Sequence, residues 1–224
     1  MLVFDPNDPF PLLTAPVPYA EAQAHSERAD AWLGLKPAAI EARLRSSAAV
    51  TSPDHNLWLH LPIQAMLTPY TELRWVLARL NPEPGATIVD LGAGYARLAF
   101  VLQRHWPEVN FIGYELAAAR LEEARRVLHG LGLAPRIQLL VADLCAADFT
   151  PPDAAAYFLY DYGTRAAIAK TLGDLRTIAR RRPIILVGRG RATRDAVERG
   201  EPWLSDVVAP EHLGNFSIYR SAGD

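Results

Sequence analysis

Three carboxylates follow three short apolar segments of this sequence, and they are the residues best suited to chemistry. Asp90 ends "TIVD", Glu115 ends "FIGYE" and Asp143 follows "LLVA". Such segments are typical of strands in a parallel sheet, whose carboxyl ends meet at one edge. Each acid alone could simply cap a turn, but three in succession indicate one site that attracts a cation and accepts hydrogen bonds.

A glycine turn follows the first acid, in "DLGAGYAR". Gly92 and Gly94 allow a ligand to approach the backbone at the start of a helix. A dinucleotide would need a third glycine where the chain has Arg97, and Asp90 would repel its pyrophosphate by about 4 kcal/mol at roughly 4 Å. S-adenosylmethionine is a nucleoside with two positive groups and no phosphate, so it meets neither obstacle. Glu115 then suits its ribose diol.

The stretches "VDLGAGYAR", "GYE" and "VAD" resemble the motifs of the class I (seven-stranded, Rossmann-like) S-adenosylmethionine-dependent methyltransferases. The resemblance extends over roughly residues 68–221. It implies that S-adenosylmethionine is the cofactor and that its methyl group passes to an acceptor by in-line displacement. The cofactor-binding residues that it implies are Asp90, Gly92, Gly94, Glu115 and Asp143, and Asp143 would accept a hydrogen bond from the adenine amino group.

Neighbouring positions complete the predicted cofactor site, which also includes Ala93, Arg97, Leu116, Leu144 and Thr68. Thr68 begins "TPY", which is similar to a segment that lies over the cofactor in some protein-lysine methyltransferases of this fold. Ala96 stands where family members often carry glycine.

The predicted fourth strand ends in "YFLYDYGT", at the position that faces the transferred methyl group in this family. We expect Asp161 to contact the acceptor or take its proton, with Tyr160 and Tyr162 as walls or hydroxyl partners. The alternative for Asp161 is a turn acid before Gly163. The Asn/Asp-Pro-Pro-aromatic signature of members that act on amide or base nitrogens is absent, which disfavours those acceptors.

Two arginines follow the predicted fifth strand in "LVGRGRATR". Arg189 and Arg191 are candidates for binding a carboxylate or phosphate of the acceptor, and the alternative is that they are solvated or paired with local acids. His55, Trp58 and His60 could cap the acceptor site. Their spacing matches no recognised metal pattern, so no metal site is predicted.

The elements that must position these residues alternate between strand and helix from residue 68 onward. Strands are predicted at 87–90, 110–115, 137–142, 156–160 and 183–187, and helices at 68–80, 96–105, 117–131 and 165–180. In the tail, "PWLSDVVAP" and "NFSIYRS" are predicted as antiparallel edge strands joined by "EHLG". This pattern predicts an α/β fold with a doubly wound, mostly parallel seven-stranded sheet and an antiparallel edge.

Residues 1–67 are predicted to form an N-terminal unit outside the Rossmann-like core of residues 68–224. Prolines at positions 6, 9, 11, 16 and 18 favour an extended arm. Helices are predicted at 19–33 and 37–49, whereas "LWLHLPIQAML" is ambiguous between strand and helix. Because the core has no other long insertion, we expect this helical extension to cap the acceptor site.

Composition narrows the remaining choices. The 224 residues are 50% hydrophobic, carry a formal net charge of −2 and include one cysteine. We expect a cytoplasmic protein that binds no membrane and methylates a protein side chain or small molecule, since the charge does not favour nucleic acid. One alternative is a non-catalytic cofactor-binding module. The other is a nicotinamide-dependent oxidoreductase, and Arg97 and the absence of a Tyr-x-x-x-Lys pair disfavour this second alternative.

Overall fold

A computed structural model describes residues 2–46, 61–133 and 135–222. Seven strands form one sheet in the order β3-β2-β1-β4-β5-β7-β6. Their bounds are β1 Thr87–Leu91, β2 Asn110–Glu115, β3 Ile137–Val141, β4 Ala156–Tyr160, β5 Ile185–Arg189, β6 Glu211–Leu213 and β7 Phe216–Arg220. Strands β1 to β5 are parallel, and β7 runs antiparallel to both of its neighbours. The predicted fold class is confirmed.

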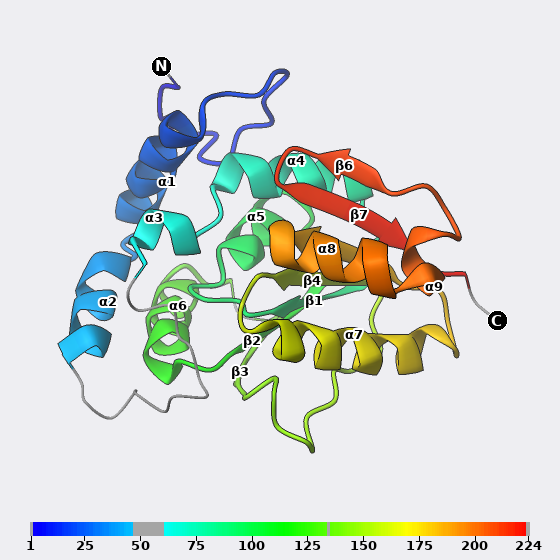
Figure 1. The fold of residues 1–224 in the computed structure, drawn as a ribbon. Coiled ribbons are helices and arrows are strands. Elements are labelled where there is room, and N and C mark those ends of the chain that lie inside the picture. Colours follow the sequence, from blue (N-terminus) through cyan, green and yellow to red (C-terminus); the bar gives the residue numbers. More distant parts are fainter. Residues whose placement is uncertain (1, 47–60, 134, 223–224) are drawn as a thin grey trace.

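Helices cover both faces of the sheet (Figure 1). The bounds on one face are α4 Tyr70–Leu80, α5 Arg97–His105 and α6 Ala118–Gly130, and on the other α7 Arg165–Ala179, α8 Arg191–Gly200 and α9 Pro202–Ser205. Because both faces are covered, the central strands are nearly continuously apolar, as in "TIVDL" and "AYFLY". The chain crosses from β3 back to β4 beside β1, so a crevice opens at the carboxyl ends of β1 and β4.

The N-terminal residues pack against the core. This extension contains α1 Tyr19–Leu33, α2 Pro37–Ser46 and α3 Ile63–Met66, and Figure 1 shows these helices to the left of the sheet, with α2 beside α6. Phe10, Ala29 and Leu33 belong to the same buried hydrophobic cluster as Tyr70 and Leu73 of α4. Extension and core therefore share apolar surface that neither would bury alone.

The start of α4 differs from its prediction. Thr68 was predicted as the N-cap and Pro69 as the first helical residue, but Pro69 is the N-cap with an extended backbone (φ −59°, ψ 141°), so that Tyr70 is the first helical residue. Pro69 stays extended instead of entering the helix as its first residue.

The C-terminal prediction was wrong in two places. Helix α8 was not predicted, and "PWLSDVVAP" is not a strand, because its first residues form α9. The edge strand β6 lies instead in "EHL", which had been assigned to the connection. Pro202 suits a first helical turn, and Gly214, with a positive φ of 61°, makes the tight turn into β7.

Candidate active site

A cavity of about 350 Å³, the main cavity, opens at the carboxyl ends of β1 to β4. Most residues of the predicted site lie on its wall: Gly92, Gly94, Glu115, Leu116, Asp143, Leu144, Tyr160, Asp161 and Tyr162. The extension adds Ala65 and Met66. The parallel sheet thus brings the sequence-separated motifs together, as expected.

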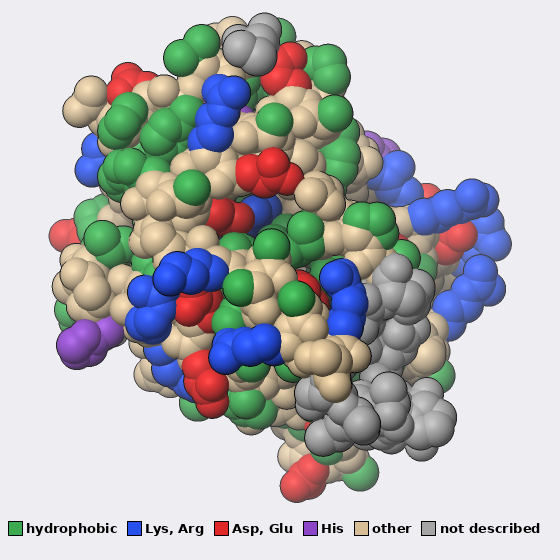
Figure 2. Space-filling model, turned by 90° about the vertical axis from the view of Figure 1, so that its left-hand side faces the viewer, with side chains coloured by type: hydrophobic (Ala, Val, Ile, Leu, Met, Phe, Trp, Pro, Cys, Tyr) green, Lys and Arg blue, Asp and Glu red, His purple; other side chains and the backbone are tan. Residues whose placement is uncertain are grey.

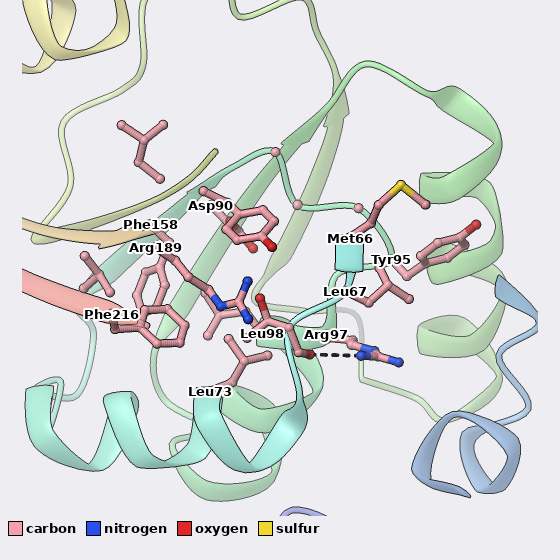
Figure 3. A pocket seen from close by; sticks show the side chains of 17 residues that line it. Met66, Leu67, Leu73, Asp90, Tyr95, Arg97, Leu98, Phe158, Arg189 and Phe216 are labelled. Atoms are coloured by element: carbon pink, nitrogen blue, oxygen red, sulfur yellow. Dashed lines mark hydrogen bonds between the residues drawn. The ribbon is translucent and has the colours of Figure 1, made fainter. Parts of the chain in front are cut away.

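A smaller side cavity of about 70 Å³ adjoins it. The two cavities share Met66, Leu67, Gly92, Gly94 and Tyr160. The other predicted residues on the wall of the side cavity are Thr68, Asp90, Ala93, Arg97 and Arg189. In Figure 3 the Arg189 side chain extends into this cavity beside Phe216.

The glycine turn has the backbone that its sequence predicts. Gly92 and Gly94 have φ values of 101° and 54°, and a Cβ atom at Gly92 would lie 3.1 Å from Cβ of Tyr162. Ala96 is also left-handed, at φ 54°. That conformation costs a non-glycine residue about 1–2 kcal/mol, and burial of the Ala96 methyl group in the core offsets part of this cost.

Asp90 lies near the end of β1, before the glycine turn. Within the described ranges it has no hydrogen-bond or ion-pair partner, although it is half-buried beneath the glycine turn. Burial and, to a smaller degree, the charge of Glu115 raise the pKa of Asp90 to about 7. A positively charged guest would relieve both effects, because it stabilises the ionised form.

Glu115 is buried and accepts hydrogen bonds from the glycine turn, from the start of the α6 region and from Arg120. Its Oε2 accepts from the Gly94 amide (3.0 Å), and its Oε1 accepts from the Ala117 amide (2.9 Å) and from Nη1 of Arg120 (3.3 Å). A carboxylate offers about four acceptor positions, so capacity for a ligand hydroxyl remains. Asp143 on the next strand end accepts from the Cys145 amide (2.8 Å).

Asp161 caps a helix. Its Oδ2 accepts from the Ala192 amide (3.0 Å), and its Oδ1 accepts from the amide (2.8 Å) and hydroxyl (2.7 Å) of Thr193. Gly190, at φ 101°, passes so close that any side chain there would overlap the carboxylate. These partners belong to the unpredicted helix α8, so Asp161 is neither a free base in this structure nor the predicted turn acid before Gly163.

The two neighbouring tyrosines also have partners. The Tyr160 hydroxyl donates to the Ala65 carbonyl of the extension (2.9 Å). The Tyr162 hydroxyl contacts the Ala167 carbonyl (3.0 Å) and Thr171 Oγ1 (2.7 Å), and burial raises its pKa to about 12. Both residues line the main cavity.

The two arginines after β5 have different environments. Arg189 is 6% exposed, lies 4.6 Å from the Tyr160 ring centre, and pairs with Glu72 at 3.3 Å. The Arg191 side chain is 91% exposed and lies 3.9 Å from Asp195. It lines neither cavity, whereas Arg189 lines the side cavity, and both arginines lie beside acids, which was the predicted alternative.

Arg97 is held by the extension. Its guanidinium forms a buried ion pair with Asp30 of α1, donates to the Thr68 carbonyl (2.9 Å) and lies 4.9 Å from the Tyr70 ring centre. In Figure 3 it points away from Asp90, and the dashed line marks its bond to Thr68. Its N–H groups bind Asp30 and the Thr68 carbonyl within the protein, and this role was not predicted.

A second buried ion pair was also missed. Glu41 of α2 pairs with Arg120 of α6, and both line the main cavity. No local signal distinguishes Glu41 within "IEARLR" from an exposed helical acid. The candidate cap residues His55, Trp58 and His60 lie outside the described residues.

The outer surface of the extension carries both charges. On the part of this face that the described residues form, Figure 2 shows basic and acidic side chains interspersed with hydrophobic ones, around a central hollow.

In the described ranges no group of three or more His, Cys, Asp and Glu residues could hold a metal ion. None of the helices that the structure describes is long and apolar enough to cross a membrane.

Comparison with curated proteins finds methyltransferases, although no family model matches the chain. Over 73 residues, 33% of the chain, it is 34% identical to the trans-aconitate 2-methyltransferase of Azoarcus sp. (strain BH72). Over 85 residues, 37% of the chain, it is 38% identical to the release factor glutamine methyltransferase of Mycolicibacterium smegmatis. The matches cover only 26% and 28% of these relatives.

Solved methyltransferases share the fold. The mitomycin 7-O-methyltransferase MmcR matches with a TM-score of 0.56 and 18% identity, over 91% of this chain and 67% of that one. An RNA methyltransferase from Salinibacter ruber, in complex with S-adenosyl-L-homocysteine, matches with a TM-score of 0.52 and 20% identity, over 69% of this chain and 92% of that one. At sequence identities of 18% and 20%, the structural likeness establishes the fold alone.

Proposed function

We propose that this chain, which has the fold of the class I S-adenosylmethionine-dependent methyltransferases, binds S-adenosylmethionine and transfers its methyl group to an acceptor. The observation that carries this proposal is Asp90, a carboxylate with a raised pKa and no partner in the described part of the chain, directly before a left-handed glycine turn. A protein keeps such a group where a ligand supplies the missing positive charge.

The main cavity suits the nucleoside. Its volume of about 350 Å³ lies within the range of roughly 300–1,000 Å³ typical of small-molecule sites. Glu115 retains acceptor capacity for a ribose hydroxyl, and Asp143 lies on the next strand end for the adenine amino group. Gly92 and Gly94 permit close approach to the backbone. The cofactor, once bound, supplies an electrophilic methyl group.

The side cavity, whose wall also includes Asp90, suits the positively charged end of the cofactor and the adjoining part of the acceptor. Tyr160 lines both cavities, and Arg189, which pairs with Glu72, is the candidate to bind a carboxylate or phosphate in the side cavity. Met66 and Leu67 of the extension line both cavities, which supports a role for residues 1–67 as a cap. The side-cavity volume of about 70 Å³ favours a small molecule or a single protein side chain as the acceptor. Three donors of α8 already use most of the acceptor positions of the Asp161 carboxylate, so it is less free to take the acceptor's proton.

Titration with S-adenosylhomocysteine tests the cofactor assignment by isothermal calorimetry. We expect binding to the wild type and at least about ten-fold weaker binding to Asp90→Asn, because one lost charge contact corresponds to about 1.4 kcal/mol or more. Asp148→Asn, an exposed acid on the loop after β3, is the matched control. No heat with the wild type, or equal affinity in Asp90→Asn, would contradict the proposal, and stabilisation by a nicotinamide dinucleotide alone would favour an oxidoreductase.

Incubation of the protein with methyl-labelled cofactor and cell lysate tests the transfer. Separation into protein, nucleic-acid and small-molecule fractions identifies the acceptor class. We expect label in the small-molecule or protein fraction. Label in nucleic acid would correct the acceptor, and label in no fraction, despite cofactor binding, would indicate a non-catalytic module.

A further inference from the structure

A chain of buried ionic contacts joins the extension to the predicted ribose-binding acid. Glu41 of α2 is 1% exposed and accepts two hydrogen bonds from Arg120, from Nε at 2.8 Å and from Nη2 at 3.1 Å. Arg120 then donates to Glu115 through Nη1 alone, at 3.3 Å. The fork of the guanidinium therefore faces Glu41 and not Glu115.

Arg120 is a potential competitor for Glu115. A guanidinium beside a carboxylate normally forms two parallel bonds, each about 2.7–2.9 Å long. If Arg120 turned its fork to Glu115, it would occupy the acceptor positions that a ribose diol needs. Its bidentate pair with Glu41 holds the fork in the opposite direction, and the contact with Glu115 stays single and long.

Glu41 also reaches the glycine turn. Its Oε1 accepts from the Tyr95 hydroxyl at 2.7 Å, and Tyr95 directly follows Gly94, whose amide donates to Glu115. One side chain of the extension therefore contacts both walls of the main cavity, α6 through Arg120 and the glycine turn through Tyr95.

We propose that Glu41 is a positioning residue that restrains Arg120 and so keeps Glu115 available for the cofactor's ribose. The extension then sets cofactor affinity in addition to covering the acceptor. This inference rests on the proposed function, because it assumes a ligand with a ribose diol in the main cavity.

Glu41→Gln tests the proposal, with binding of S-adenosylhomocysteine and of its 2′-deoxy analogue measured by calorimetry. In the wild type we expect the analogue to bind about ten-fold more weakly, since it lacks a hydroxyl for Glu115. In Glu41→Gln the natural nucleoside should lose about ten-fold in affinity, and the preference over the analogue should nearly disappear. Unchanged affinity and preference in Glu41→Gln would overturn the proposal.

Glu123→Gln is the matched control. Glu123 of α6 also contacts the extension, because its Oε1 accepts at 2.8 Å from the amide of Lys36, the residue directly before α2, but it does not line the main cavity. It should keep the ribose preference even if stability falls. A loss of preference in Glu123→Gln equal to that in Glu41→Gln would indicate a merely structural role for Glu41.

The double variant Glu41→Gln/Arg120→Gln covers the case in which the single variant does not fold. Removing the competitor together with its restraint should return affinity and ribose preference to within about three-fold of the wild type. Persistent loss of the preference in a folded double variant would refute the competition. Absence of nucleoside binding by the wild type would instead contradict the proposed function.

Discussion

Asp90 gives the ligand-free protein a pH dependence that a cofactor should reverse. Burial and the charge of Glu115 raise the pKa of this carboxyl group from its ordinary value of 3.8 to about 7 in the folded protein. The folded state therefore holds this proton more tightly than the unfolded chain, and raising the pH across that window destabilises the ligand-free protein. A bound cation favours the ionised form, so binding should release the proton.

We therefore expect the affinity for S-adenosylhomocysteine, which carries an ammonium group, to increase as the pH rises through about 7. Below that pH, binding must first remove the proton from Asp90. Calorimetry between about pH 5.5 and 8.5 measures this profile. Asp90→Asn should flatten it, and a wild-type affinity that falls across the same range would contradict the assignment of Asp90.

At the scale of elements, the connection from β5 to α8 depends on two residues that face each other. Asp161 supplies the acceptors for the first turn of α8, and Gly190 leaves room for its carboxylate. The negative charge also lies at the positive end of the helix dipole. This pair fixes the start of α8 against the end of β4, whose last residue, Tyr160, lines the main cavity.

Asp161→Ala should lower the free energy of unfolding by about 1–2 kcal/mol, because α8 loses its cap. Urea denaturation followed by circular dichroism measures the change. Asp195→Asn on the same helix is the comparison, since its contacts to exposed arginines are 3.7 and 3.9 Å long and should contribute less than about 1 kcal/mol. Full stability together with abolished methyl transfer in Asp161→Ala would instead make Asp161 the catalytic base.

At the scale of the whole molecule, the extension and the core are one buried structure. The ion pair between Arg97 and Asp30 contacts Tyr70, which belongs to the same buried hydrophobic cluster as Phe10 of the extension. Both charged groups are almost completely buried, with side chains 6% and 7% exposed. Such a pair contributes little relative to apolar packing, but removing one partner leaves a buried charge without compensation.

Asp30→Asn should therefore destabilise the protein by about 3 kcal/mol, in a single transition that includes extension and core. Urea unfolding, followed by both tryptophan fluorescence and circular dichroism, measures this. Glu27→Gln, an exposed acid on α1 that bonds Gln64, should change stability by less than about 1 kcal/mol. Separate transitions for the two probes would show that the extension folds independently.

The candidate site was predictable where it depends on strand ends. Asp90, Glu115 and Asp143 follow apolar segments, and parallel pairing obliges the carboxyl ends of such strands to meet. The antiparallel edge of the sheet was less predictable. Strand β6 has only three residues, and the segment before it, from Pro202, begins with a helix instead of a strand. Short edge elements are determined by packing and turn geometry more than by their own pattern.

The amino-acid sequence by itself determined the fold class and the acids around the glycine turn, because periodicity and turn chemistry act over a few residues. Only the tertiary structure decided how the long polar side chains are used. Arg97 meets Asp30 across 67 positions and Arg120 meets Glu41 across 79. Asp161 meets Thr193 across 32. The reason is physical: a buried charge takes whichever partner the packing brings within reach, and that partner leaves no mark on the neighbouring sequence.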